Sequence, residues 1–255
     1  MKKLLLSFAL MLALLNPAFA SVTFDGTDDF VSFGSSSTVD DQHPFSVYMV
    51  VEIVNHGADD ILATKATAGS STGSWDFKMS TTSTIRFEKE WDGTNLNVVA
   101  SDSTVTTGVK YAFVVTYDGT ATASTGVHIY KDGAEVGYKT QTNGTGSIRS
   151  DASYNLCVGA FGDASNAANI IVYDFGFIDR VLTAAEALAL STGRIKFSAL
   201  QYGDDNTMVY STMNECGDAA TCSGTSQFWD YSGNGNHGTA SNSPVGTSER
   251  HMSYP

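Results

Sequence analysis

The sequence is poor in cationic residues and proline, and it has only three cysteines. Lys and Arg total 14 against 27 Asp and Glu, which gives a net charge of −13 over 255 residues. Nucleic acid binding rewards a clustered cationic face, so this composition argues against nucleic acid as a partner. With four prolines the chain has no proline-rich tract. Its hydrophobic content of 42% is sufficient for a packed core and argues against general disorder.

Long apolar runs are also missing, except at the N-terminus. There, Lys2-Lys3 precede the apolar run Leu4–Leu15, and Ala18-Phe19-Ala20 follows it. This order of charge, apolar run and A-x-A site predicts a signal peptide over residues 1–20 that is cleaved near Ala20. The run is too short to span a bilayer, and no later stretch approaches the roughly 20 apolar residues that a span needs. We therefore expect a secreted, periplasmic or cell-surface protein with no membrane span.

Export makes a disulfide chemically reasonable. Cys216 and Cys222 lie six residues apart in a segment of small and polar residues, a spacing that a local disulfide can close. A zinc site is the alternative, but no Cys or His pair has the spacing of zinc ligands. We predict a disulfide between Cys216 and Cys222 and a buried free thiol at Cys157, which lies in an apolar run.

Almost every periodic segment has the period of two that is typical of β-strands. From Phe45 to Ile53 each odd position is apolar, so this segment has one core face and one mixed face. Turn signals separate such segments, and Asp132-Gly133 is the strongest hairpin signal because both residues tolerate positive φ. Strands are expected at Phe45–Ile53, Ile61–Ala66, Trp75–Ser80, Thr84–Trp91, Leu96–Ser101, Val109–Tyr117, Gly126–Lys131, Ala134–Tyr138, Asn155–Gly162 and Ile170–Ile178. The pattern predicts an all-β, two-sheet antiparallel jelly-roll sandwich.

One short helix is expected after the last of these strands. Thr183 and Glu186 form a capping box, and Gly193 can end the helix. Beyond it the composition shifts toward Asn, Gly and Ser. We therefore divide the mature chain into a jelly-roll domain over residues 21–193 and a loop-rich C-terminal appendage over residues 194–255.

Several segments resemble the laminin-G-like branch of the concanavalin A-like lectin/glucanase superfamily, in the family's order. The landmarks are Phe24–Val31 (F-D-G-T-D-D-F-V), Phe45–Ile53, Tyr111–Gly119 (Y-A-F-V-V-T-Y-D-G), Val127–Gly133 (V-H-I-Y-K-D-G) and Tyr173–Glu186. The resemblance implies a two-sheet jelly roll that commonly binds calcium and often serves as a carbohydrate- or protein-binding module. It does not by itself identify a ligand.

The appendage departs from the family's order. Phe228–Thr239 contains D-Y-S-G-N-G-N-H-G-T, which resembles the family's first-strand segment, yet here it follows the helix. Two interpretations stay open. The appendage is either a truncated second module, or it supplies the first strand of the sandwich from the C-terminus, as in a circular permutation.

Calcium is the metal that the sequence favours. By alternation, Asp174 shares a strand face with Ile170 and Val172, and a carboxylate among apolar residues needs a cation or hydrogen bonds. Asp25, Asp28 and Asp29, with neighbouring backbone carbonyls, offer the hard oxygen ligands that Ca²⁺ prefers. The resemblance places the opening turn near the closing strand. We therefore expect Ca²⁺ at Asp25, Asp28 and Asp174, with backbone-bonded, solvated carboxylates as the alternative.

Glycoside hydrolysis needs two converging carboxyl groups. Arg86, Glu88, Glu90 and Asp92 alternate along one strand, as do the catalytic carboxylates of laminarinase-type glucanases that the superfamily contains, but the spacing differs. A solvated strand face, with Lys89 and Arg86 offsetting the acids, is the better interpretation. We therefore predict no catalytic residues.

Sugar binding needs aromatic rings beside polar groups, and the candidate rings are Trp75, Trp91, Tyr138 and Trp229. We select Trp91 with Asp92 and Asn95 as the ligand-binding residues. The function expected is a secreted, lectin-like module for a glycan or polysaccharide, associated with calcium and not catalytic. A structural or adhesive protein that binds another surface protein is the alternative, and a glycoside hydrolase is the third.

Overall fold

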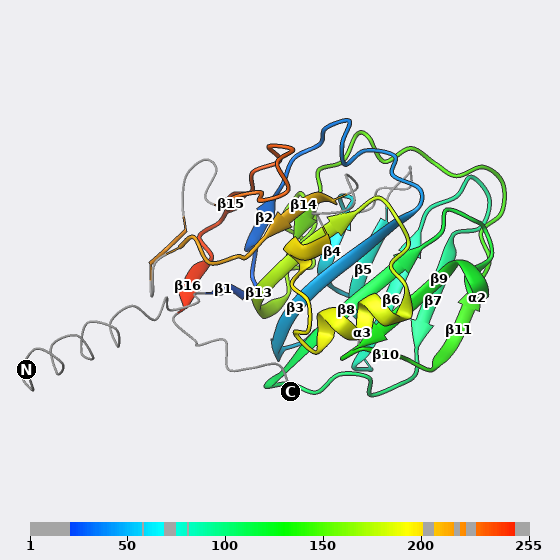
Figure 1. Ribbon diagram of the computed structural model, residues 1–255, viewed down its shortest axis with the longest axis horizontal. Coiled ribbons are helices and arrows are strands. Elements are labelled where there is room, and N and C mark those ends of the chain that lie inside the picture. The colour runs from blue at the N-terminus through cyan, green and yellow to red at the C-terminus, as the bar shows by residue number, and fades with distance from the viewer. Residues whose placement is uncertain are drawn as a thin grey trace, which may run out of the picture.

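Two antiparallel β-sheets face each other and form a sandwich (Figure 1). The computed structural model describes residues 21–57, 59–68, 75–80, 82–200 (the backbone only at 198 and 199), 207–216, 220–222 and 228–247. The predicted signal peptide lies outside the described residues. Each sheet contains eight strands, so the predicted all-β sandwich is confirmed.

In the first sheet the strands follow the spatial order β10 (Ala134–Glu135), β9 (Val127–Lys131), β8 (Val109–Tyr117), β3 (Phe45–Asn55), β13 (Asn169–Ile178), β1 (Ser21–Asp25) and β16 (Val245–Thr247), with β14 (Thr207–Ser211) also paired to β13. In the second sheet the order is β11 (Tyr138–Thr142), β7 (Leu96–Ala100), β6 (Thr84–Lys89), β5 (Trp75–Ser80), β4 (Asp60–Lys65), β12 (Cys157–Val158), β2 (Phe30–Ser32) and β15 (Thr239–Ser241).

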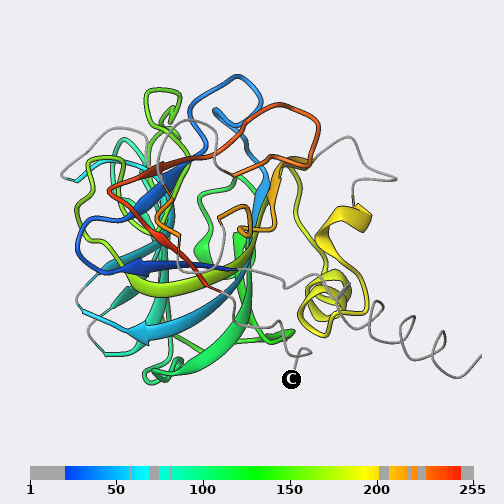
Figure 2. The same cartoon turned by 90° about the vertical axis from the view of Figure 1, so that its left-hand side faces the viewer.

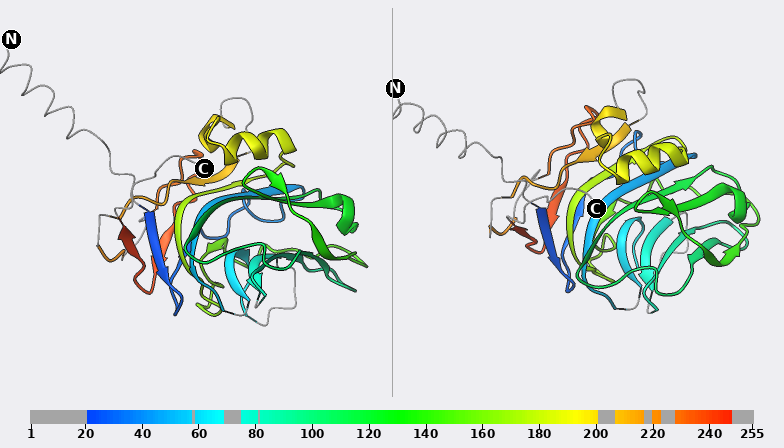
Figure 3. Two further views of the ribbon diagram at one scale, coloured as in Figure 1. Left: turned by 90° about the horizontal axis from the view of Figure 1, so that it is seen from below. Right: turned by 60° about the horizontal axis from the view of Figure 1, so that its bottom comes forward.

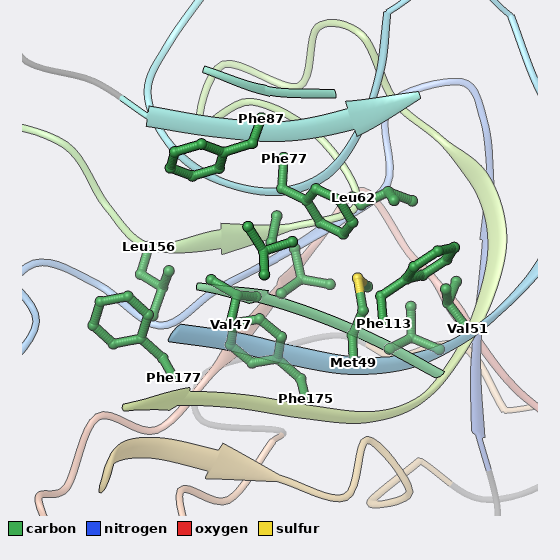
Figure 4. Close-up of a cluster of buried hydrophobic side chains, with 14 of the residues drawn as sticks. Val47, Met49, Val51, Leu62, Phe77, Phe87, Phe113, Leu156, Phe175 and Phe177 are labelled. Atoms are coloured by element: carbon green, nitrogen blue, oxygen red, sulfur yellow. The ribbon is translucent and has the colours of Figure 1, made fainter. Parts of the chain in front are cut away.

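The core lies between the sheets and follows the alternation of the strands. Val47, Met49 and Val51 point inward from β3, where they meet Phe77 and Phe87 of the opposite sheet (Figure 4). Each of these side chains is at most 1% exposed. Burial of large apolar side chains contributes about 1.5–3 kcal/mol each, so this layer is the main stabilising element.

A second, smaller core covers the outer face of the first sheet. Helix α3 (Ala184–Ser191) and the 3₁₀ helix η1 (Phe197–Leu200) lie on that face (Figure 3). The predicted capping box is present, since Thr183 Oγ1 accepts a hydrogen bond from Glu186 N at 3.2 Å and Glu186 Oε2 accepts one from Thr183 N at 2.8 Å. A short helix α2 (Ala123–Gly126) precedes β9.

Three strands of the C-terminal segment are built into the sandwich. β14 pairs with β13 and β16 with β1 in the first sheet, while β15 pairs with β2 in the second. Figures 1 and 2 show the red β16 beside the blue β1, although these strands come from opposite ends of the chain. The described part of residues 194–255 therefore completes both sheets of the same sandwich, as expected if it supplies the first strand from the C-terminus.

A β-bulge in β13 changes which residues face the core. The register with β3 pairs Val51 with Val172 and then Val50 with Asp174, so one residue of β13 is skipped. Val172 packs in the central core, whereas Val50 belongs to the outer core, and Asp174 follows Val50 to the outer face. Simple alternation, which placed Asp174 on the face of Ile170 and Val172, is therefore wrong at this point.

Three local predictions are confirmed. Asp132 and Gly133 have φ of 51° and 82° and form the turn between β9 and β10. Cys216 and Cys222 form a disulfide with a Cα–Cα distance of 5.7 Å, and Cys157 is a buried free thiol. No helix within the described ranges is long and apolar enough to cross a membrane.

Candidate functional site

A group of polar side chains occupies the outer face of the second sheet, on β5, β6 and at β7. Phe77 and Phe87 point into the core, so the residues that alternate with them point outward. The strand register places Asp76 opposite Glu88, Lys78 opposite Arg86, and Glu88 opposite Asn97. We call these residues, with the adjacent Asn95, the charged strip: Asp76, Lys78, Arg86, Glu88, Asn95 and Asn97.

The members of the charged strip hold one another in fixed positions. Glu88 accepts from Arg86 and from Asn95 Nδ2, the latter at 3.2 Å, and Arg86 Nε also donates to Asn97 Oδ1 at 2.8 Å. Lys78 Nζ lies 3.2 Å from Asp76 Oδ2 and 3.7 Å from Glu88 Oε2. The charged side chains are between 11% and 26% exposed, so their donors and acceptors are recessed but reachable from solvent.

Asp76 has an unusual protonation equilibrium. Its pKa is raised to about 6, because burial and the charge of Glu88 raise it more than the Lys78 ammonium lowers it. The Oδ1 atom of Asp76 has no hydrogen-bond partner among the described residues. The charged strip therefore contains a carboxyl group that gains a proton at mildly acidic pH, which the sequence analysis did not identify.

The predicted ligand residues have different environments. Trp91 is 9% exposed and belongs to the central core. Asn95 accepts from Trp91 N at 3.3 Å and donates to Glu88, so it is part of the charged strip. Asp92 is exposed and forms an ion pair with Arg149 at 2.8 Å. The structure therefore presents Asp92 to solvent, holds Asn95 in the strip, and buries the indole ring.

The opening turn brings three carboxylates together. The carboxylate oxygens of Asp25, Asp28 and Asp29 lie within 4.8 Å of one another, so they could hold a metal ion. Burial raises the pKa of Asp29 to about 6, and the charges of Asp25 and Asp28 add to this effect. The carboxyl groups of Asp25 and Asp28 are therefore close together, as predicted, and that of Asp29 lies beside them.

A pocket of about 290 Å³ adjoins this acidic cluster, and Asp25 lines both. Asp60, also in the pocket, accepts a hydrogen bond from Gly57 N at 2.5 Å, and burial raises its pKa. His56 Nε2 lies 2.9 Å from Ser83 Oγ, and its Nδ1 atom is buried without a partner in the described part of the chain. The pocket is lined by Asp25, Gly26, Asn55, His56, Gly57, Asp60, Ala167 and Asn169.

Asp174 lies apart from this cluster. Asp25 pairs with Asn169, five positions from Asp174 along β13, or about 16 Å at 3.3 Å per residue. The carboxyl group of Asp174 faces Tyr210 and the charge of Lys196 on the outer side of the first sheet. Asp25 and Asp28 therefore come together without Asp174.

A second group of possible ligands, Asp41, His43 and Asp151, already has cationic neighbours. Asp151 lies 3.7 Å from Lys65 Nζ and 3.5 Å from Lys89 Nζ, and both lysine side chains are fully buried. Lys89 is therefore a core residue, and the expectation of a solvated strand face is wrong for it. Burial and the charge of Lys89 together lower the pKa of His43 to about 4. A metal ion here would face two ammonium groups.

The aromatic candidates differ sharply in exposure. Trp75 is 1% exposed and packs in the core, and Tyr138 hydrogen-bonds to Ile129 N and Glu135 at the sheet edge. Trp229 is 53% exposed, and Tyr231, which the sequence analysis did not select, is 51% exposed. An aromatic residue in a turn rich in Gly and Asn was the available signal for Tyr231.

Comparison with solved structures finds the same fold in a protein described as carbohydrate-binding. A provisionally assigned carbohydrate-binding protein from Bacteroides ovatus aligns at a TM-score of 0.61 and 12% identity, covering 89% of this chain and 59% of the other. This chain therefore spans about three fifths of the length of that protein. The SAP-like pentraxin of Limulus polyphemus aligns at a TM-score of 0.47 and 12% identity, covering 67% of this chain and 81% of the other.

The sialidase CBM40 module of Ruminococcus gnavus, solved with α2,3-sialyllactose, aligns at a TM-score of 0.48 and 10% identity, covering 68% of this chain and 98% of the other. Among curated protein sequences, none matches this chain. The family model described as the concanavalin A-like lectin/glucanases superfamily matches residues 25–187. On this match, the chain belongs to the laminin G-like family of the concanavalin A-like lectin/glucanase superfamily.

Proposed function

We propose that this protein is an exported, non-catalytic glycan-binding module. The charged strip is the observation that carries the proposal. It offers fixed donors (Arg86, Lys78) and acceptors (Glu88) at the surface of a rigid sheet. Sugar hydroxyl groups both donate and accept, and a preorganised polar array binds them without losing side-chain entropy. The carbohydrate-binding assignment of the Bacteroides protein with the same fold supports this interpretation.

The contacts of Glu88 favour binding over hydrolysis. A glycosidase needs one carboxyl group as acid and a second as nucleophile or base. Glu88 accepts from Arg86 and Asn95 and lies near Lys78, and these donors stabilise its carboxylate form. Such a carboxylate is a poor nucleophile. Hydrolysis stays the third possibility, and release of reducing ends from β-glucans would establish it.

Calcium is part of the proposal. Asp25, Asp28 and Asp29 would hold Ca²⁺ in the opening turn. Their three carboxylates converge there and supply the hard oxygen ligands that Ca²⁺ prefers. The fit rests on the raised pKa of Asp29, which reflects burial and two neighbouring negative charges that a cation would offset. The metal would fix the turn that leads from β1 to β2 and so would have a structural role.

The test is an array of polysaccharides and oligosaccharides probed with residues 21–255, first in calcium and then in EDTA. Every glycan that binds is titrated against Arg86→Gln, which removes a strip cation. Lys110→Gln is the matched control, since Lys110 lies over the Tyr173 ring on the first sheet, at 3.9 Å. We expect Arg86→Gln to weaken binding at least tenfold and Lys110→Gln to leave it unchanged.

Three other results would change the conclusion. Equal binding by wild type and Arg86→Gln would remove the charged strip from the site. Absence of binding to every glycan on the array would overturn the proposal and favour the alternative, a module that binds a surface protein. If a surface protein is the target, excess soluble saccharide does not displace it, whereas a glycan target is displaced.

A further inference from the structure

The two most exposed large apolar side chains among the described residues lie two positions apart in one turn. Trp229 is 53% exposed and Tyr231 is 51% exposed, whereas the other exposed large apolar side chains reach at most 42%. The turn joins Phe228 to Gly238, which form an antiparallel bridge beneath it. Large aromatic rings are usually buried, so a pair exposed side by side is typical of a binding surface.

The backbone of this turn is fixed by a buried carboxylate between the two rings. Asp230 is 6% exposed, and it accepts hydrogen bonds from the backbone N–H groups of Tyr210 at 3.1 Å, Ser232 at 2.9 Å and Asn236 at 3.0 Å. Tyr231 N also donates to the carbonyl of Tyr210 at 2.7 Å. The exposed rings therefore project from a rigid support on β14.

The rings themselves are also held in place. The indole of Trp229 meets the imidazole of His237 edge to face, with centroids 4.7 Å apart. The ring of Tyr231 packs against Tyr210 at 6.3 Å, and its hydroxyl group donates to Glu215. A rigid aromatic surface binds with little loss of conformational freedom.

The polar groups at this surface favour an uncharged ligand with hydroxyl groups. His237 Nδ1 accepts from Asp230 N at 3.1 Å, so the neutral imidazole carries its proton on Nε2 and can donate beside the indole. Among the described residues, Glu215 and Asp230 are charged groups that hydrogen-bond within this turn, and both are acidic. An anionic ligand would be repelled, whereas the C–H face of a neutral pyranose can stack on an aromatic ring.

We propose that Trp229 and Tyr231 form a second glycan-binding site that takes a neutral saccharide, with a hexose ring stacked on Trp229 and a hydroxyl group accepting from His237. This site rests on the proposed function but is separate from the charged strip. The strand β15 that follows the turn lies four strand positions from β5 in the second sheet, or about 19 Å at 4.8 Å per strand.

Tryptophan fluorescence tests the proposal directly, because the chain has three tryptophans and the other two are at most 9% exposed. The probes are cellohexaose, laminarihexaose, xylohexaose and mannohexaose, with 3′-sialyllactose as the anionic probe. We expect at least one neutral hexasaccharide to shift the emission to the blue and to protect it from acrylamide. We expect Trp229→Ala to abolish this response and to weaken binding at least tenfold.

Three variants test whether the fluorescence response and the binding depend on the aromatic ring of Trp229. Val181→Ala removes exposed apolar surface elsewhere, since Val181 is 38% exposed, and should bind like wild type. Trp229→Phe keeps an aromatic face and should retain part of the affinity, provided that its melting temperature equals that of wild type. A fluorescence response that persists in full in Trp229→Ala comes from Trp75 or Trp91 and would contradict the assignment of the site to Trp229.

Two patterns would overturn the second site while sparing the proposed function. One is glycan binding that depends on Arg86 but is indifferent to Trp229→Ala. The other is a Trp229 response to 3′-sialyllactose alone, which would contradict the neutral ligand class. Absence of any saccharide binding, on the array and in solution, would overturn both proposals together.

Discussion

The hydroxyl group of Tyr210 on β14 forms a hydrogen bond with the buried carboxyl group of Asp174 on β13. Asp174 lies at the bulge, between the part of β13 that pairs with β1 and the part that pairs with β14. The contact therefore joins the C-terminal segment to the middle of the first sheet. Asp174 is 8% exposed, and its burial raises its pKa to about 8, so the carboxyl group is largely protonated at neutral pH.

This protonation makes stability depend on pH. Between the unfolded pKa of 3.8 and the folded pKa of about 8, the folded protein holds a proton that the unfolded chain has released. The contribution of Asp174 to stability therefore falls as pH rises through this range. Asn does not titrate, so the stability of Asp174→Asn relative to wild type should increase by about 4 kcal/mol between pH 5 and pH 9. Urea unfolding at several pH values measures the difference.

Asp92→Asn is the control for this titration, because the side chain of Asp92 is 57% exposed. Its stability curve should run parallel to that of wild type. If the curve of Asp174→Asn is also parallel to wild type, the carboxyl group of Asp174 has an ordinary pKa.

The elements that the sequence predicted correctly depend on local chemistry. Asp132-Gly133 forms its turn because both residues accept positive φ, and Thr183 with Glu186 caps α3 because the two groups are three residues apart. The same is true of Cys216 and Cys222, which are close in sequence as well as in space. Such features need no knowledge of distant contacts.

The features that escaped prediction depend on contacts between distant residues. A bulge is set by the partner strand, so alternation along β13 could not show that Asp174 leaves the face of Val172. Lys89 is buried because Asp151, from a distant loop, receives its ammonium group. The charged strip needs the register of β5 with β6, and that register places Asp76 opposite Glu88. The sequence analysis named Asn95 and Glu88 as candidates but did not predict the hydrogen bond between them.

Asp151 should be essential for stability, because it lies between two fully buried ammonium groups. Asp151→Asn removes the carboxylate that lies 3.5 Å from the Lys89 ammonium group, which also donates to the carbonyl of Arg149 at 3.2 Å. An uncompensated buried charge costs about 3–5 kcal/mol, and we expect a loss of that order in chemical denaturation.

Two variants test whether charge is the cause of this loss. Lys89→Met in the Asp151→Asn background should recover part of the stability, because the buried cation that faced the lost carboxylate is removed. Asp102→Asn breaks an exposed pair with Lys139 and should leave stability close to that of wild type, because solvent screens exposed pairs. No recovery in the double variant would show that Asp151 acts through packing instead.

Calcium should stabilise the wild-type protein through the opening turn. Binding to the folded state alone adds about 2.7 kcal/mol when free calcium is 100 times the dissociation constant. Asp28→Asn should reduce this gain, because Asp28 is one of three carboxylates that converge there. Asp174→Asn should keep the full gain, since Asp174 lies elsewhere. Melting curves in calcium and in EDTA measure both, and a wild type that is indifferent to calcium would contradict the site.

A circular permutant should fold to the same sandwich. Ser21 pairs with Thr247 in the β1–β16 ladder, and their hydroxyl groups lie 2.5 Å apart. A short glycine linker can therefore join residue 247 to residue 21, with new ends at residues 207 and 200. The permutant carries D-Y-S-G-N-G-N-H-G-T before F-D-G-T-D-D-F-V, as in the order of the family that the chain resembles. Because it keeps every strand pair, its unfolding should be cooperative and its melting temperature close to that of residues 21–255.

Deletion of the same segment should have the opposite effect. Residues 21–200 lack β14, β15 and β16, which leaves edges of β13, β1 and β2 unpaired. Met208, Val209 and Phe228 would also be lost from the central core. Unpaired strand edges and missing core side chains favour aggregation, so this fragment should not unfold cooperatively. A stable fragment with native circular dichroism would mean that the sandwich folds without the C-terminal strands.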